Sequence, residues 1–376
     1  MNKYLLYTTL ALLATTACRQ TYNPPVIANP PNYLVVEGFI ENNGTDSTIF
    51  TLSRTVKLDS NAYTPEQGAS VTVEGTDNSV FRLGEGNNGT YGAPLPLLNS
   101  NVTYRLHIIT AGGKQYTSDY VPIVTSPPID SISWKRNNNA PNAGIRIYAS
   151  THDPNNNTHY YRWEYQETWE FHAAFSATIQ YTPATGIVGY YPNTKYYCWH
   201  SDKSSSVIIA SSTQLSQDLI HEAPVVLIPL NSQQLQMKYS ILVKQYALTK
   251  EAFNWWQILQ KNTEQIGSIF GVQPSVNPGN IHCLTDTTEQ VLGFVGGGNT
   301  RTQRIFITHD QALPWDYETD CMDTKVSPDP ATLANEYAGG NLPWSQDVMP
   351  PAVHVAYKTC VDCTYSGTNI PPSFWQ

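Results

Sequence analysis

The sequence predicts a mainly β protein built from two tandem β-sandwich domains of the immunoglobulin or prealbumin type. Three observations predict this fold class: short strand-like runs recur along the chain, turns rich in glycine and asparagine separate them, and only one segment has a helical pattern. The composition agrees, because tyrosine favours strands and the chain has 24 tyrosines with only 14% charged residues. The 376 residues are enough for two or three domains.

The first sandwich is expected over residues 33–126. It opens with the run YLVVEGFI at 33–40, whose dense apolar residues indicate a buried strand. Turns rich in glycine and asparagine follow, for example at 85–89 and 111–114. The other expected strands lie at 49–52, 70–74, 80–83, 104–108 and 115–118.

The second sandwich is expected over residues 127–309, after the break at Pro127 and Pro128. Residues 144–149 alternate between apolar and polar side chains, as a half-buried strand does. The aromatic run at 160–165 is typical of a core strand in an immunoglobulin-like sandwich.

A glycine run at 296–299 is expected to turn a hairpin between strands at 291–295 and 304–307. A phosphate-binding loop is the alternative, but no helix follows the glycines to bind an anion at its N-terminus.

One segment, 249–270, is expected to be an α-helix inserted in the second sandwich. Thr249 can cap its N-terminus and Gly271 can end it. One face carries Ala252, Trp256, Leu259, Ile266 and Phe270. Trp255 and Ile258 point away from that face, so they either cover a sandwich edge or the domain junction, or bind a partner.

Residues 310–376 are expected to form an irregular segment that packs on the second domain and is held by disulfides, because they contain many prolines and little periodicity. Five cysteines follow Cys18, so at least one is free or pairs between chains. Cys321 is expected to pair with Cys360 or Cys363. The Cys360–Cys363 spacing also permits a metal or redox role, although no second such motif accompanies it.

The N-terminus has the pattern of a bacterial lipoprotein signal. A lysine and a short apolar run precede small residues and Cys18, so residues 1–17 are expected to be removed and Cys18 to be lipidated. An ordinary secretory signal is the alternative, and both place the mature protein outside the cytoplasm. The proline- and asparagine-rich residues 18–32 then form a flexible tether.

Charge and motifs limit the function classes. The net charge of −9 without basic patches argues against nucleic acid, and the chain has no HExxH, GxSxG or P-loop motif. We therefore expect a non-enzymatic protein with no cofactor and no metal. The acidic side chains Asp316, Glu318, Asp320 and Asp323 could hold calcium, but their spacing is not that of an EF-hand, so a solvated loop is favoured.

The long aromatic loop at 180–197 is the most suggestive binding surface. Tyr190 and Tyr191 lie within it, and long loops on a rigid sandwich often carry binding residues. Tyrosines of this kind serve either as anchors for a protein partner or as stacking platforms for a sugar. The sequence leaves both uses open. Together with Trp255 and Ile258, these tyrosines are the expected partner-binding residues.

The chain resembles a family known as domain of unknown function 4249. The matching stretches are the start ending at Cys18 and residues 33–42, 68–75, 127–134, 198–213, 248–270, 279–283 and 360–375. The resemblance implies an outer-membrane lipoprotein associated with a TonB-dependent transporter, and it supplies no catalytic residues. The first domain is also similar to the prealbumin-like sandwiches that precede some such transporters.

Lipoproteins of this kind are sometimes O-glycosylated at short Asp-Ser/Thr triplets, which gives the candidates Ser47, Ser131 and Thr287. Two functions follow as expectations. In the first, the lipid-anchored protein is a partner of a TonB-dependent transporter or another envelope protein. In the second, it is a surface glycan-binding or adhesin-type module that uses the 180–197 loop. The sequence does not say which face of the outer membrane it occupies.

Overall fold

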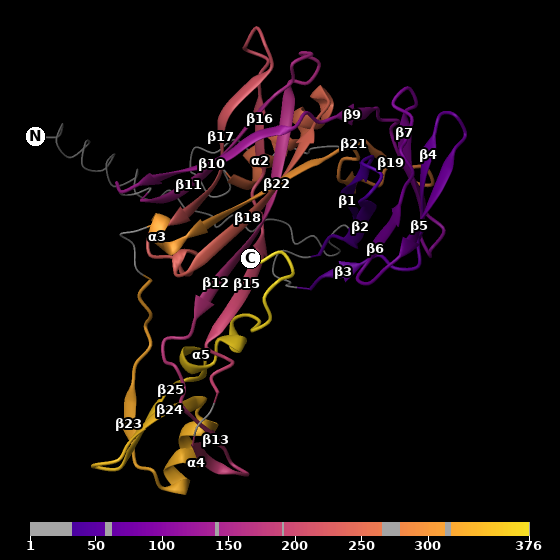
Figure 1. Ribbon diagram of the computed structural model, residues 1–376. Helices are drawn as coiled ribbons and strands as arrows, with labels where there is room; N and C mark the ends of the chain where they lie inside the picture. The colour runs from indigo at the N-terminus through magenta and orange to yellow at the C-terminus, as the bar shows by residue number, and fades with distance from the viewer. Residues whose placement is uncertain are drawn as a thin grey trace, which may run out of the picture.

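The computed structural model describes residues 32–56, 62–139, 143–189, 192–264, 279–312 and 317–375. The described chain is mainly β, as predicted, and its sheets gather in three regions (Figure 1). We call these regions the N-terminal sandwich, the central sandwich and the distal lobe. No helix among the described residues has the length and hydropathy needed to cross a bilayer.

The N-terminal sandwich contains twelve hydrogen-bonded strands in the order β19-β8-β7-β4-β5-β6-β2-β1-β21-β9, with β20 beside β1 and β3 beside β2. Strand β5 pairs with both β4 and β6, so it joins the two layers. Their bounds are β1 (Leu34–Glu41), β2 (Ser47–Arg54), β3 (Thr64–Pro65), β4 (Ser70–Gly75), β5 (Val80–Glu85), β6 (Thr90–Pro94), β7 (Tyr104–Ile109), β8 (Gln115–Ser118), β9 (Ile123–Thr125), β19 (Ile281–Cys283), β20 (Val291–Leu292) and β21 (Gly297–Asn299).

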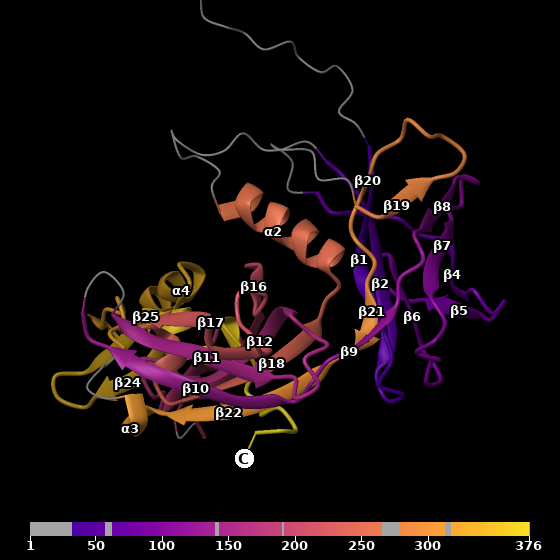
Figure 2. The same cartoon turned by 90° about the horizontal axis from the view of Figure 1, so that it is seen from above.

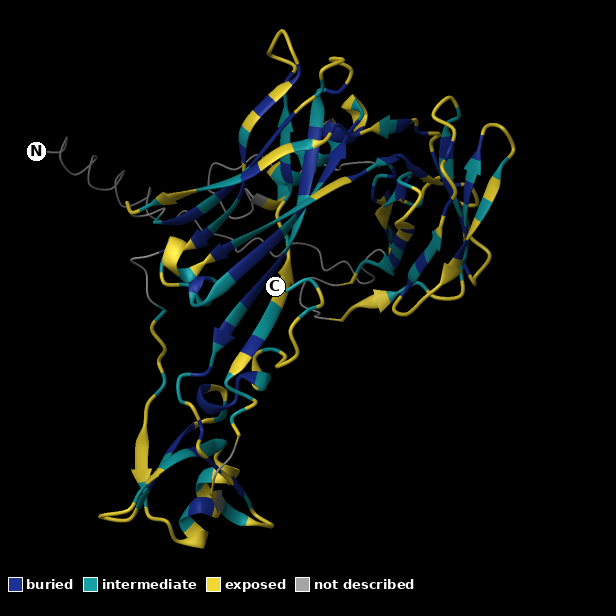
Figure 3. Ribbon diagram, in the orientation of Figure 1, coloured by how far each residue is buried: buried dark blue, intermediate teal, exposed yellow. Residues whose placement is uncertain are grey.

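The core of this sandwich follows from alternation along its strands. In β4, Val71 and Val73 are fully buried, while the alternate side chains Ser70, Thr72 and Glu74 are only partly buried. Leu34, Phe50 and Tyr116 add fully buried side chains from three other strands. The core therefore lies between the two layers, as the dark blue segments of Figure 3 show.

Residues 279–300 do not belong to the central sandwich, where they were expected. Strand β21 pairs in parallel with β1 and β9 of the N-terminal sandwich, and β19 pairs with β8. The expected hairpin at 296–299 is therefore wrong. The glycines instead allow this segment to lie close to the backbones of β1 and β9. A Cβ on Gly293 would lie 2.1 Å from the Val36 oxygen, and one on Gly298 would lie 2.2 Å from the Val124 oxygen.

The central sandwich packs a three-stranded sheet, β10-β11-β17, against a sheet in the order β15-β12-β18-β22, with β16 also on β12. Strand β12 has thirteen residues and pairs with β15, β16 and β18. Its Tyr161 and Trp163 are buried, as the aromatic run predicted. Its elements are β10 (Ile129–Asn137), β11 (Gly144–His152), β12 (Tyr160–His172), β15 (Tyr197–Lys203), β16 (Ile208–Ser211), β17 (Leu219–Pro229), η1 (Gln233–Leu235), β18 (Lys238–Ala247), α2 (Lys250–Glu264), β22 (Arg301–Thr308) and α3 (His309–Ala312).

The distal lobe projects from the far end of β12 and β15 (Figure 1). A hairpin, β13-β14, packs there against the sheet β23-β25-β24 and helix α4 through Tyr181, Leu333 and Val353. Residues 310–376 thus hold more regular structure than expected. The elements are β13 (Ile179–Thr182), β14 (Gly186–Gly189), β23 (Thr324–Val326), α4 (Pro330–Ala338), β24 (Asn341–Asp347), β25 (Ala352–Tyr357), α5 (Lys358–Val361) and η2 (Cys363–Tyr365).

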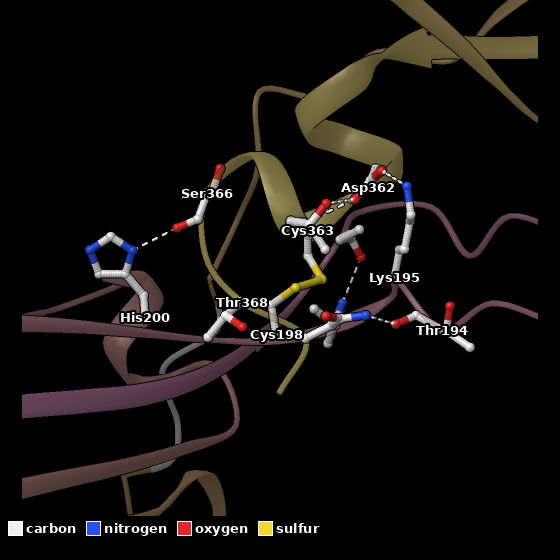
Figure 4. Close-up of a disulfide and its surroundings, with 12 residues drawn as sticks. Thr194, Lys195, Cys198, His200, Asp362, Cys363, Ser366 and Thr368 are labelled. Carbon is white, nitrogen blue, oxygen red and sulfur yellow. Dashed lines mark hydrogen bonds and ion pairs between the residues drawn. A yellow bond between two sulfur atoms is a disulfide. The ribbon is translucent and has the colours of Figure 1, made fainter. Parts of the chain in front are cut away.

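Two disulfides hold the C-terminal segment, as expected for this part of the chain. Cys321 is bonded to Cys360, one of the two pairings that the sequence left open, and Cys363 is bonded to Cys198 on β15. Figure 4 shows the second bond beside the Lys195–Asp362 ion pair, at 2.8 Å. The two cysteines of the Cys360–Cys363 motif therefore do different things: Cys360 closes a loop within the C-terminal segment, and Cys363 ties the segment to β15.

Two of the described connections between the N-terminal and central sandwiches, near Ser126 and near Thr300, run side by side. The Ser126 amide donates to the Asn299 side chain at 2.6 Å, and Arg301 donates back to the Ser126 carbonyl at 3.3 Å. Across the same junction, the buried Glu41 carboxylate accepts from the Thr300 amide and lies 3.3 Å from the Lys244 ammonium. These buried polar contacts fix the orientation of the two sandwiches.

Candidate binding cleft at the junction of the two sandwiches

Helix α2 begins where the sequence predicted. The Thr249 hydroxyl accepts from the Ala252 amide at 3.2 Å, which is N-capping geometry, and Glu251 lies in the first turn. The helix is described from Lys250 to Glu264, and the rest of the predicted span lies outside the described residues.

The buried side of α2 packs on both sandwiches. Ala252 and Phe253 are buried beside Tyr246 of β18, and Phe39 of β1 meets Tyr246 edge-on with 5.1 Å between ring centroids. Figure 2 shows α2 between the N-terminal and central sandwiches. The buried face of the helix therefore covers the domain junction.

A buried arginine attaches the helix to the central sandwich. The Arg162 guanidinium lies 4.1 Å from the Tyr246 ring centroid and 4.2 Å from that of Trp256. Its ion-pair partner is Glu164. Burial alone would raise the pKa of the Glu164 carboxyl, but the charge of Arg162 and the Tyr246 hydroxyl outweigh burial and lower this pKa.

Trp255 and Ile258 line an open cleft of about 550 Å³ between α2 and the N-terminal sandwich. The Trp255 ring meets the Trp256 ring edge-on at 4.8 Å and lies 5.9 Å from Phe294, which precedes β21. Both Trp255 and Ile258 are half-buried. They are thus walls of a cleft and not isolated exposed side chains.

The opposite wall comes from the loop between β8 and β9. Tyr120 in this loop is 42% exposed, and the Arg105 guanidinium lies 4.9 Å from its ring. Behind it, Asn280 exchanges two hydrogen bonds with the backbone of Val295, at 2.8 and 2.9 Å, and its carbonyl accepts from the Asp119 amide. Because backbone bonds hold this wall in place, the cleft is largely preformed.

The cleft has an acidic rim and an aromatic interior. Asp119 and Glu251 line it, and its described lining includes no lysine, arginine or histidine. Asp119 pairs with His282 outside the lining, at 3.1 Å. A negatively charged ligand would therefore meet two carboxylates and no lining cation, whereas an apolar, neutral or cationic group would not be repelled.

The residue types in the cleft suit binding. Its described lining contains aromatic rings beside the carboxylates of Asp119 and Glu251, and the Thr249 hydroxyl caps the helix. Among the described residues, no three His, Cys, Asp or Glu side chains are grouped as a metal site. What the cleft can do is bury an inserted side chain or a small ligand against aromatic rings.

The other predicted binding residues, Tyr190 and Tyr191, lie outside the described residues, as does Cys18. The described part of the 180–197 loop is not one long irregular loop. Residues 179–189 form the β13-β14 hairpin, and Tyr181 is buried in the distal lobe 5.8 Å from the Tyr337 ring. Tyr181 thus belongs to the core of the lobe, because the C-terminal segment supplies a sheet and a helix for it to pack on.

Three further predicted residues are surface positions. Ser47, Ser131 and Thr287, the candidate glycosylation sites, are all exposed. The aspartate before each of them accepts a hydrogen bond from a nearby side chain. Asp130, for example, accepts one from His152 at 2.8 Å. Glycosylation of these residues stays a prediction. Cys283, by contrast, is a buried free thiol, 4% exposed.

Sequence reasoning missed the residues that complete the cleft, chiefly Asp119, Tyr120 and Phe294. They come from segments placed in two different expected domains, so no local pattern joined them. The sequence does contain one indication that this segment packs closely on another. Four glycines lie at 293–298, and such a density of glycine is found where backbones approach closely as well as in turns.

These observations define a class of protein: a mainly β, disulfide-bonded protein of two sandwiches with an open aromatic cleft at their junction. Within this class, the chain belongs to the family described as Domain of unknown function (DUF4249), whose model matches residues 19–304. A comparison with curated proteins found no match.

Proposed function

We propose that the protein is a non-enzymatic, lipid-anchored outer-membrane lipoprotein that acts as a partner subunit of a TonB-dependent transporter or a related envelope complex. The observation that carries the proposal is the position of Trp255 and Ile258 in the wall of a preformed cleft at a rigid junction. Half-buried aromatic side chains in such clefts are the usual anchoring sites for an inserted segment of a partner.

The N-terminal sequence supports the membrane part of the proposal. A signal ending at Cys18, followed by a proline-rich stretch, would hold the folded part at the membrane surface on a tether. Confinement beside a transporter raises the effective concentration of the cleft, so modest contacts suffice for a stable complex.

The test is an affinity isolation of the lipidated protein from detergent-solubilised outer membranes of its native host, read by mass spectrometry. The wild type should recover a TonB-dependent transporter in stoichiometric amount. The double variant Trp255→Ala, Ile258→Ala should recover at least about tenfold less, since two contacts at the centre of an interface are lost. The control Leu97→Ala removes a side chain that is 73% exposed on the N-terminal sandwich and should recover as much as the wild type.

Two outcomes would contradict the proposal. Recovery of the lipoprotein without a transporter in mild detergent would reject the transporter partnership. Equal recovery by the wild type and the double variant, both folded, would reject the cleft as the contact.

Binding of a glycan is the second candidate function, and the chemistry of the cleft favours it specifically. Aromatic rings beside carboxylate and amide groups, without a lining cation, suit a neutral sugar that stacks and accepts or donates hydrogen bonds. This candidate requires the isolated, non-lipidated body to bind oligosaccharides in calorimetry without a transporter. Trp255→Ala should then abolish the heat of binding.

A further inference from the structure

The loop between β24 and β25 presents two large apolar side chains to solvent. Val348 is 82% exposed and Met349 is 90% exposed. Hairpin loops normally hold glycine, asparagine or aspartate, whereas this one reads Val-Met-Pro-Pro. Turn formation explains the two prolines but not Val348 and Met349. Figure 3 shows exposed loops at the far end of the distal lobe, remote from the two sandwiches.

Ion pairs connect the strands at the point where this loop begins. Asp347, the last residue of β24, lies 2.9 Å from the Lys325 ammonium and 3.2 Å from His354 Nε2. His354 Nδ1 is in turn 2.7 Å from Asp323. The three strands β23, β24 and β25 are thus bonded to one another directly beneath the loop.

The loop is restricted on its other side as well. Pro350 and Pro351 fix two backbone φ angles between Met349 and β25. The Cys321–Cys360 disulfide anchors the segment that leads into β23. A restricted loop loses little conformational entropy when it binds, so its two apolar side chains are preorganised for insertion.

The charge of the lobe decides which kind of surface it suits. Residues 317–365 carry seven acidic side chains and two lysines. Three of the seven are in ion pairs with Lys195, Lys325 and His354, so the excess negative charge of the lobe comes from the other four. An acidic surface is repelled by anionic lipid headgroups, which argues against insertion of the loop into a bilayer. A protein surface rimmed with lysine or arginine would instead attract it.

We propose that the 347–351 loop is a docking surface that inserts Val348 and Met349 into an apolar pocket, rimmed by basic residues, on a partner protein. The pocket buries the two apolar side chains, and the acidic lobe around them steers and orients the approach. This surface lies in the distal lobe, so it acts independently of the junction cleft. Only the expectation that the partner is an envelope protein rests on the proposed function.

The test uses the full lipidated protein in outer membranes of its native host. A photo-crosslinking amino acid, p-benzoylphenylalanine, replaces Met349 in one sample and Leu97 in a matched control, because Leu97 is also largely exposed. Crosslinked products are identified by mass spectrometry down to the attached peptide. A companion variant, Val348→Ser with Met349→Ser, is compared with Leu97→Ser for recovery of the same protein.

The proposal expects one protein crosslinked from position 349 and not from position 97, through an apolar stretch flanked by lysine or arginine. Recovery of that protein should fall at least about tenfold in the double serine variant, as expected for a lost anchor pair. It should also fall as salt is raised. Crosslinks to lipid alone, to copies of this chain alone, or equally from both positions would overturn it. If the crosslinked protein is not a transporter, the docking surface stands, and the affinity isolation alone decides the transporter partnership.

Discussion

The guanidinium carbon of Arg162 lies 4.2 Å from the centroid of the Trp256 ring, so a cation on β12 directly contacts helix α2. The Tyr246 ring covers another side of the same group, and Arg162 is only 8% exposed. Desolvated cation–π contacts are stronger than exposed ones. The helix that walls the cleft is therefore held by one specific contact in addition to apolar burial.

Trp256→Ala should destabilise the protein by about 3 kcal/mol, the low end of the range for truncating a tryptophan in a core. The substitution removes packing and leaves the Arg162 charge less well covered. Chemical denaturation measures the loss, and hydrogen exchange should show faster opening of the amides in α2. Ile258→Ala, which trims only the cleft wall, is the control and should cost clearly less. Equal losses would show that the arginine contact does not hold the helix.

Gly298→Ala should destabilise the N-terminal sandwich by about 1–3 kcal/mol, as overpacking does. An added Cβ would lie 2.2 Å from the Val124 carbonyl oxygen, so β21 would have to move away from β9. The matched control is Gly189→Ala, where an added Cβ meets nothing within 4 Å. Thermal unfolding of both variants tests the prediction, and it is contradicted if the two melt together.

Breaking the Cys198–Cys363 bond with two serines should lower the free energy of unfolding by up to about 5 kcal/mol, because it closes a loop of 165 residues. The Cys321–Cys360 bond closes only 39 residues and should contribute about 1 kcal/mol less on the same chain-entropy argument. Urea unfolding of the two double variants gives the comparison. A larger effect from the shorter loop would mean that native contacts, and not chain entropy, decide the order.

The folded mature protein should carry one thiol that is protected until unfolding. Cys283 is the free cysteine among the described residues and is 4% exposed, while the other four are in disulfides. Burial limits its reactivity. Ellman's reagent on a body that begins after Cys18 should therefore label no thiol under native conditions and one thiol per chain in denaturant. Immediate labelling of the native protein would contradict this.

The distal lobe should lose stability as the pH rises through the folded pKa of His354, which lies above the ordinary histidine value of about 6.5. The hydrogen bond to Asp323 raises the pKa of His354, burial opposes it, and Asp347 adds to the rise. A histidine with a raised pKa stabilises the fold fully below its unfolded pKa of about 6.5 and loses this effect as the pH passes the folded value. Unfolding between pH 5 and 9 should show the loss in the wild type and a smaller one in His354→Gln. His152→Gln is the control. The pKa of His152 is also raised, but this residue lies in the central sandwich, so its substitution should leave the pH-dependent loss in the distal lobe unchanged.

Local patterns were sufficient to predict the strands, the start of α2 and the aromatic core of β12. These features depend on neighbours in the sequence, such as the Thr249 cap and the alternation in β4. The cleft could not be predicted, because Tyr120, Trp255 and Phe294 come together only after residues 279–300 return to the first sandwich. The glycines at 293–298 show no alternation of apolar and polar side chains that would indicate a strand, and a glycine-rich segment is equally typical of a turn.

Residues 279–300 also set an order of events when the chain is made. The N-terminal sandwich contains two lengths of chain, one ending near Thr125 and one that includes β19, β20 and β21. A chain delivered from its N-terminus leaves β1 without its parallel neighbours β20 and β21, and β8 without β19, until Asn299 has emerged. Such distant pairings are slow to form. The first region to be synthesised is therefore completed only after most of the central sandwich is present, and a fragment ending at residue 126 would lack three of its strands.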